Sequence, residues 1–173
     1  MANKQAFTPE EWTKILESVV LSGMAVTAAD PSGIIGLLKE SFASATMFAK
    51  AKSDPDARAI IKDVVAEFQT SEGRGIMQEA IKKRFSGASQ ADISGRAVDA
   101  LREVSAILDA KAPEDAPAFK GWLREISTKV ADAATEGGFL GFGGEKVSDA
   151  EKATLSDISK ALGVTSTLAE PLE

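Results

Sequence analysis

Hydrophobic positions recur every three or four residues along most of the chain, which is the spacing of one face of an α-helix. The first clear stripe runs from Trp12 to Met24, and the most regular one runs from Phe119 to Ala133. Further stripes lie within 34–45, 60–68, 76–85, 93–108 and 155–162. No segment alternates β-branched and polar residues as a strand would. The pattern predicts an all-α fold, a single-domain bundle of about seven helices.

The residues before the first stripe have the pattern of a helix start. Thr8 is expected as the N-cap, Pro9 as the first helical residue, and Glu11 as the residue that completes a capping box. Phe7 is expected to pack against Trp12 as a hydrophobic staple. Together these residues predict a helix that begins at Pro9.

Similar signals divide the middle of the chain. Asp30-Pro31 and Asp54-Pro55 each combine an acidic cap with a proline, so each is expected to open a helix. A break between two helices is expected at 71–75, where two glycines occur close together.

The end of the chain carries a second capping box and a stop signal. Ser148 and Glu151 are expected to cap the last helix, and Gly163 is expected to end it as a left-handed residue. The residues beyond it show no periodicity. A single helical domain is therefore expected over 1–164, with a frayed tail at 165–173.

The amino-acid composition excludes most of the common types of catalytic site. Cysteine, histidine and tyrosine are all absent, which excludes disulfides, thiolate zinc sites, thiol nucleophiles and the usual general base. The remaining candidates are Ser, Thr, Lys and 26 carboxylates. The carboxylate pairs Asp54/Asp56 and Glu114/Asp115 lie at expected helix starts and are interpreted as helix caps. We therefore expect no catalytic residues, no metal site and no cofactor, and a protein that is not an enzyme.

The charge distribution bears on possible partners. The net charge is −6, and residues 88–173 hold 9 basic and 15 acidic side chains. An acidic protein lacks the basic surface that binding to phosphates requires, so no nucleic-acid partner is expected. The acidic half is interpreted as a solvated surface, with a cation-binding face as the alternative.

The nearly uncharged segment 18–38 is the one candidate for a membrane span in the sequence. Asp30 is the only charged residue between Glu17 and Lys39. A membrane span needs about 20 continuous apolar residues, and this stretch is interrupted by Asp30-Pro31 and by scattered Ser and Thr residues. Two buried helices that meet at a corner are expected instead. The chain begins without the pattern of a signal peptide, so a cytoplasmic protein is expected.

The segment 137–144 is the strongest candidate site, because it has five glycines around Phe139, Leu140 and Phe142. Its residues fit neither a phosphate-binding loop, nor a dinucleotide fingerprint, nor a calcium-binding loop. In one interpretation the three apolar side chains plug the end of the bundle, with Phe139 or Leu140 buried and Phe142 more exposed. In the other they form a surface for a partner, an apolar ligand or a membrane.

The last quarter of the chain resembles a known family. Gly144-Glu145-Lys146-Val147-Ser148-Asp149-Ala150-Glu151, followed by Leu155, Ile158 and Leu162-Gly163, is similar to the helical-hairpin signature of the TerB-like, tellurite-resistance-associated family. The resemblance, mainly over 125–163, implies an all-α bundle and a bacterial cytoplasmic protein linked to metal or envelope stress. The family's Asp-Gly falls on Gly144-Glu145, so the acidic residue associated with cations is missing from its position.

Two functions from different classes follow. The leading hypothesis is a non-enzymatic cytoplasmic protein that acts by binding a protein partner or a second copy of itself, with a possible link to stress. The alternative is a carrier of a small apolar ligand or a protein that binds a lipid surface. It is motivated by the nearly uncharged, glycine-containing segment 18–38 and by the loop that carries Phe139 and Phe142. Membrane contact is not favoured but stays open.

Overall fold

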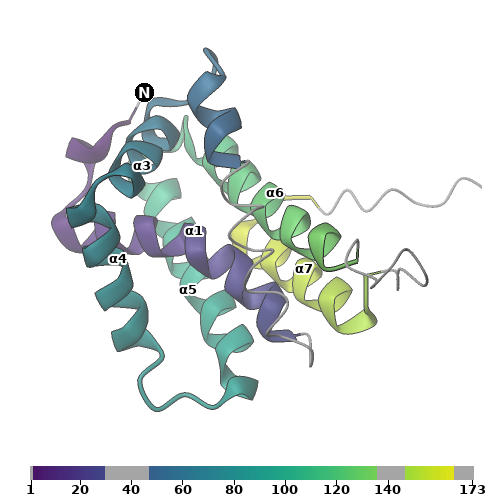
Figure 1. The fold of residues 1–173 in the computed structure, drawn as a ribbon. Helices are drawn as coiled ribbons and strands as arrows, with labels where there is room; N and C mark the ends of the chain where they lie inside the picture. The colour runs from purple at the N-terminus through teal and green to yellow at the C-terminus, as the bar shows by residue number, and fades with distance from the viewer. Residues whose placement is uncertain (1, 30–46, 136–146, 166–173) are drawn as a thin grey trace, which may run out of the picture.

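The computed structural model describes residues 2–29, 47–135 and 147–165 of the 173-residue chain. Within these ranges every regular element is helical and no strand occurs (Figure 1). The prediction of an all-α bundle is therefore confirmed. The elements are a short 3-10 helix η1 (Lys4–Ala6), α1 (Pro9–Ala29), a helical segment at 47–53, α3 (Ala59–Gln69), α4 (Ser71–Arg84), α5 (Gln90–Lys111), α6 (Ala116–Thr135) and α7 (Asp149–Leu162).

Helix α1 lies at the centre of the bundle. It contacts α4, α5, α6 and α7, and Figure 1 shows it crossing in front of α5 with α3 and α4 on one side and α6 and α7 on the other. Its predicted stripe accounts for this position, since Ile15, Leu16 and Val19 are almost completely buried. Leu101 of α5, Phe119 of α6 and the apolar side of α7 complete one continuous core.

The start of α1 confirms the predicted cap. The Thr8 N–H donates to Glu11 Oε2 at 2.8 Å, and the Glu11 N–H donates to Thr8 Oγ1 at 3.3 Å. The Phe7 and Trp12 rings, 6.1 Å apart between centroids, form the expected staple. These contacts satisfy backbone donors that the first helical turn cannot pair internally.

The uncharged stretch after Glu17 forms the core-facing second half of α1, as far as it is described. Its serines are buried, but their hydroxyls are paired, because Ser18 Oγ donates to the Ile15 carbonyl at 2.7 Å and Ser22 Oγ donates to the Ser18 carbonyl at 2.8 Å. The predicted helix start at Asp30-Pro31 lies outside the described residues. Among the helices in the described ranges, none combines the length and the apolar character needed to cross a membrane.

Asp54-Pro55 does not open a helix, and this prediction was wrong. Helix α3 begins at Ala59, and Asp54 follows the end of the helical segment 47–53. The Asp54 Oδ1 atom accepts the Asp56 N–H at 2.9 Å, which makes a tight turn. The acidic residue and the proline therefore mark a corner between two helices instead of a helix start.

The predicted break at 71–75 was also misplaced. Helix α4 runs through both glycines of that segment, and the break lies at Thr70, whose Oγ1 accepts the Gly73 N–H at 2.9 Å. A Cβ built on Gly73 would lie 2.3 Å from the Glu67 carbonyl oxygen. Gly73 is required for the close approach of α4 to the end of α3, rather than for ending a helix.

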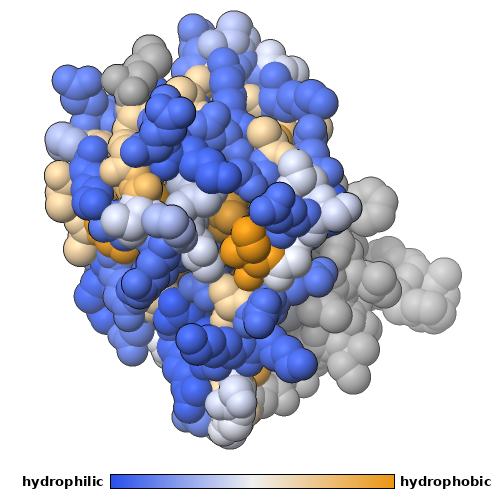
Figure 2. All heavy atoms as spheres, turned by 90° about the vertical axis from the view of Figure 1, so that its left-hand side faces the viewer, coloured by the Kyte–Doolittle hydropathy of each residue, from blue (hydrophilic) through white to orange (hydrophobic). Residues whose placement is uncertain are grey.

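Helix α4 is attached less tightly than the pattern predicted. Among its residues only Gly73 is buried, and Ile76 is 41% exposed although it was expected to face the core. Ile81 and the adjoining Phe85 pack against the core only in part. Figure 2 shows this side of the molecule as mainly hydrophilic, with apolar side chains in small patches.

The described part of the chain ends as predicted. The Ser148 N–H donates to Glu151 Oε2 at 2.8 Å, and the Glu151 N–H donates to Ser148 Oγ at 3.2 Å. Gly163 ends α7 with φ 66°. Leu155 and Leu162 are buried. Apart from Thr165, the predicted tail 165–173 lies outside the described residues, so the boundary at 164 stays a prediction.

Candidate functional site

The loop proposed from the sequence is not part of the described structure. Phe139, Leu140 and Phe142 lie outside the described residues, so both interpretations of the loop remain predictions. Val147, which follows the loop, is half-buried and packs against the core. In the described residues, two cavities lie beside α6 and are further candidate sites.

The first cavity, here called the Trp122 pocket, has a volume of about 320 Å³. It lies between the helical segment 47–53, the turn at 54–58, α3 and α6. Its apolar lining is formed by Met47, Ala51, Ala57, Ile61, Ala118 and Trp122. Pockets that hold ligands usually combine an apolar lining with a smaller number of polar groups. This cavity is more polar than that, because five charged residues line it beside the six apolar ones.

Aromatic contacts hold the walls of the Trp122 pocket together. The Phe48 ring lies 6.1 Å from the Trp122 ring and 5.0 Å from the Phe68 ring, between centroids. Phe119 packs edge-on against Trp122 at 5.5 Å. The segment 47–53 is thereby fixed to α3 and α6, because such aromatic pairs add to the energy of apolar burial.

Two ion pairs fix the cations at the rim. Lys50 Nζ lies 2.8 Å from Glu125 Oε1, and Arg58 Nη1 lies 3.6 Å from Asp115 Oδ1. The hydrogen bond with the Glu125 carboxylate raises the pKa of Lys50, so its ammonium group is retained at neutral pH.

The rim carries more carboxylates than cations. Asp54, Asp56 and Glu125 line the pocket together with Lys50 and Arg58, which leaves one negative charge in excess. Within the described ranges, neither Asp54 nor Asp56 forms an ion pair. The two aspartates therefore give the lining its excess of negative charge.

Asp115 corrects a prediction. It was interpreted as a helix cap, but its side chain is 1% exposed and its Oδ2 accepts the N–H of Ala2, more than a hundred residues away in sequence. Its other oxygen faces Arg58. The carboxylate therefore anchors the beginning of the chain and the rim of the Trp122 pocket at the start of α6, a role that no local pattern indicates.

A second cavity, here called the α6–α7 pocket, has a volume of about 430 Å³. Val147, Leu155 and Val164 give it an apolar lining, and Arg124 lies in its wall. Gly121 and Glu125 of α6 border both pockets. A Cβ built on Gly121 would meet nothing within 4 Å, so the absent side chain leaves this side of α6 open.

The sequence pattern predicted only part of the Trp122 pocket. The hydrophobic stripe correctly predicted that Trp122 belongs to the core, but it did not indicate that the same residue also lines a pocket. The Lys50–Glu125 pair joins residues 75 positions apart, and nothing local connects them. The one available signal was Gly121, a glycine inside the most regular helical stripe.

The described residues contain no candidate metal site, and the chain matches no protein with which it was compared. In the part of the chain that the structure describes, no group of three or more Asp or Glu side chains is arranged to hold a metal ion. Comparisons with protein-family models, with curated proteins and with solved structures give no match. The TerB-like resemblance therefore stays a hypothesis that depends on the pattern at 144–163.

Proposed function

We propose that this chain is a non-enzymatic binding protein and that its Trp122 pocket receives a side chain of a protein partner. The observation that carries the proposal is an open, partly apolar pocket of about 320 Å³ with an acidic rim. Small-molecule sites range from about 300 to 1,000 Å³, so this volume is at the small end and suits an anchoring side chain. Anchors of this kind commonly dominate the energy of a protein interface.

The charge states of the rim support binding rather than proton transfer. A general acid or base works best with a pKa close to the working pH. The hydrogen bond with Glu125 raises the pKa of Lys50. Its ammonium group is therefore a constant positive charge, suited to attracting a ligand rather than to exchanging a proton.

The chemistry of the rim indicates the occupant. The apolar part of the lining, which includes Trp122, favours an aliphatic or aromatic side chain. Asp54 and Asp56 favour a positively charged neighbour. The expected partner is thus a peptide segment in which a large apolar residue lies beside a lysine or an arginine.

Selection from a random peptide library tests this function. The wild-type protein should enrich peptides that combine a large apolar residue with an adjacent Lys or Arg. The variant Ala118→Leu, which places a larger side chain in the lining, should not enrich them. Equal enrichment by both proteins, or no enrichment by either, would argue against the proposal. Light scattering on the same sample shows whether a second copy of the chain is the partner.

Location and biological context form a separate part of the proposal. The resemblance at 144–163 supports a cytoplasmic, stress-associated role. Fractionation of cells that produce the protein tests the location. Comparing its amount before and after tellurite or envelope stress tests the association.

A second candidate function is a carrier of a small apolar ligand. It is supported by the α6–α7 pocket, which is larger than the Trp122 pocket and has Val147, Leu155 and Val164 in its lining. The two candidates use different cavities, so each can be tested without the other.

A further inference from the structure

We infer that the α6–α7 pocket binds a small organic anion, namely a carboxylate with an aliphatic chain, and that Arg124 recognises the carboxylate. The inference rests on the second candidate function and makes it more specific, because it assigns a charge and a position to the head of the ligand.

Arg124 is held in place by hydroxyl groups. Its Nε donates to Ser159 Oγ at 2.6 Å, and its Nη1 donates to Thr128 Oγ1. Both hydroxyls are themselves positioned, since Ser159 donates to the Leu155 carbonyl at 2.8 Å and Thr128 donates to the Arg124 carbonyl at 2.9 Å. The guanidinium group is thus oriented before a ligand arrives, which lowers the entropic cost of binding.

The guanidinium group retains capacity for an anion. Arginine has five N–H donors, and the two hydroxyls engage only some of them. Across the described ranges, no carboxylate lies within ion-pair distance of Arg124, unlike Arg58, Arg84 and Arg102. A planar guanidinium can bind a carboxylate through two parallel hydrogen bonds, which makes it suited to this ligand class.

The other charges of the pocket leave Arg124 as the main cation. Lys152 pairs with Asp149 at 3.0 Å, and Glu125 pairs with Lys50 at 2.8 Å. Asp132 also lies in the lining, and its negative charge acts on Arg124. Burial lowers the pKa of Arg124 because desolvation disfavours the cation, and a bound carboxylate would compensate for this loss of solvent.

The rest of the cavity suits an aliphatic chain. Leu155 is 3% exposed and forms a firm wall, while Val147 and Val164 are half-buried at the edge of the core. Methylene groups transferred from water to such a lining contribute to binding in proportion to the apolar area that they bury. The pocket combines an oriented cation with an apolar wall. Inorganic phosphate has no apolar part and could use only the cation, so an aliphatic carboxylate fits the pocket better.

Titration of the full chain with sodium octanoate tests the inference, with octanol and inorganic phosphate as comparison ligands and calorimetry as the readout. Octanoate should bind saturably and about tenfold or more tightly than octanol, which has no charge for Arg124, and than inorganic phosphate, which has no aliphatic chain. Equal binding of octanol and octanoate would overturn the role of Arg124 and leave the apolar-carrier function standing. Absence of saturable binding by both would overturn the inference and that function together. Tighter binding of phosphate than of octanoate would overturn the assigned ligand class.

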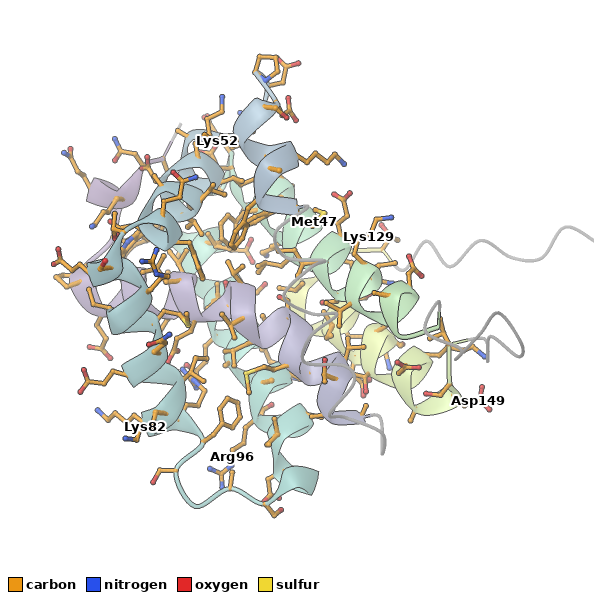
Figure 3. All side chains as sticks on the ribbon, in the orientation of Figure 1. Met47, Lys52, Lys82, Arg96, Lys129 and Asp149 are labelled. Carbon is orange, nitrogen blue, oxygen red and sulfur yellow. The ribbon has the colours of Figure 1, made fainter. Side chains whose placement is uncertain are left out.

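Variants of α6 locate the binding. Arg124→Gln should weaken octanoate binding by about tenfold or more, whereas Lys129→Gln should leave it within about twofold, because an exposed charge contributes little. Lys129 is exposed on the same helix and is labelled in Figure 3. Arg124→Lys keeps the charge without the planar donors and should have intermediate affinity. If Arg124→Gln does not fold, Arg124→Lys is compared with the wild type instead. Unchanged affinity in the folded Arg124 variants would contradict the inference.

Discussion

Arg84 Nη2 lies 2.7 Å from Glu17 Oε2 and ties the end of α4 to the central helix α1. The Glu17 side chain is only 5% exposed, whereas that of Arg84 is 22% exposed. Because α4 buries little of its own surface, this pair is one of the few strong links between α4 and the rest of the bundle.

Removing Arg84 should therefore destabilise the protein more than removing a neighbouring cation. Arg84→Met leaves the buried Glu17 carboxylate without its partner, and we expect a loss of about 3 kcal/mol in the free energy of unfolding. Lys82→Met, on the same helix (Figure 3), should change it by less than about 0.5 kcal/mol. Urea denaturation of the two variants measures both effects. Similar stability of the two variants would contradict this account of α4.

The corner between α3 and α4 predicts opposite effects for two glycines of one helix. Gly73→Ala should destabilise by about 1–3 kcal/mol, because its Cβ would overlap the Glu67 carbonyl oxygen. Gly75→Ala should stabilise by about 0.5–1 kcal/mol, since a Cβ there meets nothing within 4 Å and alanine favours the helix. Thermal unfolding followed by circular dichroism gives the sign of each change. Stabilisation by both substitutions would show that the corner is looser than described.

Glu11 links stability to pH. Its pKa is lowered, first by the hydrogen bond from Lys111 and then by that from the Thr8 N–H. A carboxylate with a lowered pKa contributes stability that is present above its unfolded pKa and is lost as the pH falls through its folded pKa. Lys111→Gln should raise the Glu11 pKa and should destabilise the protein at neutral pH but not in acid.

Titration of the Glu11 carboxyl carbon by NMR, in the wild type and in Lys111→Gln, measures this effect. Equal pKa values in the two proteins would show that the ion pair at 2.8 Å does not persist in solution.

Alanine substitutions in the loop 137–144 distinguish the two interpretations of its apolar side chains. If Phe139 anchors the loop in the bundle, Phe139→Ala should cost about 3–5 kcal/mol in the free energy of unfolding. Phe142→Ala should change stability by less than about 0.5 kcal/mol, because Phe142 is expected to be more exposed. If alanine at Phe139, Leu140 or Phe142 changes the free energy of unfolding by less than about 0.5 kcal/mol in every case, the loop is better interpreted as a contact surface.

The sequence predicted those features that depend on neighbouring residues. The caps at Thr8 and Ser148 were correct because each needs only residues within one helical turn. Asp54-Pro55 was misinterpreted because the same two residues can end a corner as well as start a helix. The role of Gly73 depends on where α3 ends in space, which the local pattern does not specify.

The candidate site depended on distant contacts. The Trp122 pocket requires the segment 47–53 to lie against α6, and its rim requires pairs such as Lys50–Glu125 and Arg58–Asp115. Hydrophobic periodicity reports which side of a helix is buried but not which helix covers it. The stripe therefore predicted that Trp122 is buried, without predicting the cavity beside it.

The affinity of a selected peptide for three proteins tests the central claim, that the Trp122 pocket is the binding site, most directly. The wild type is compared with Ala118→Leu in the pocket and with Ala106→Leu, a matched change at an exposed position of α5. We expect Ala118→Leu to weaken binding by about tenfold or more and Ala106→Leu to leave it unchanged within about twofold, as an anchoring contact requires. Equal affinities for all three proteins would contradict the claim.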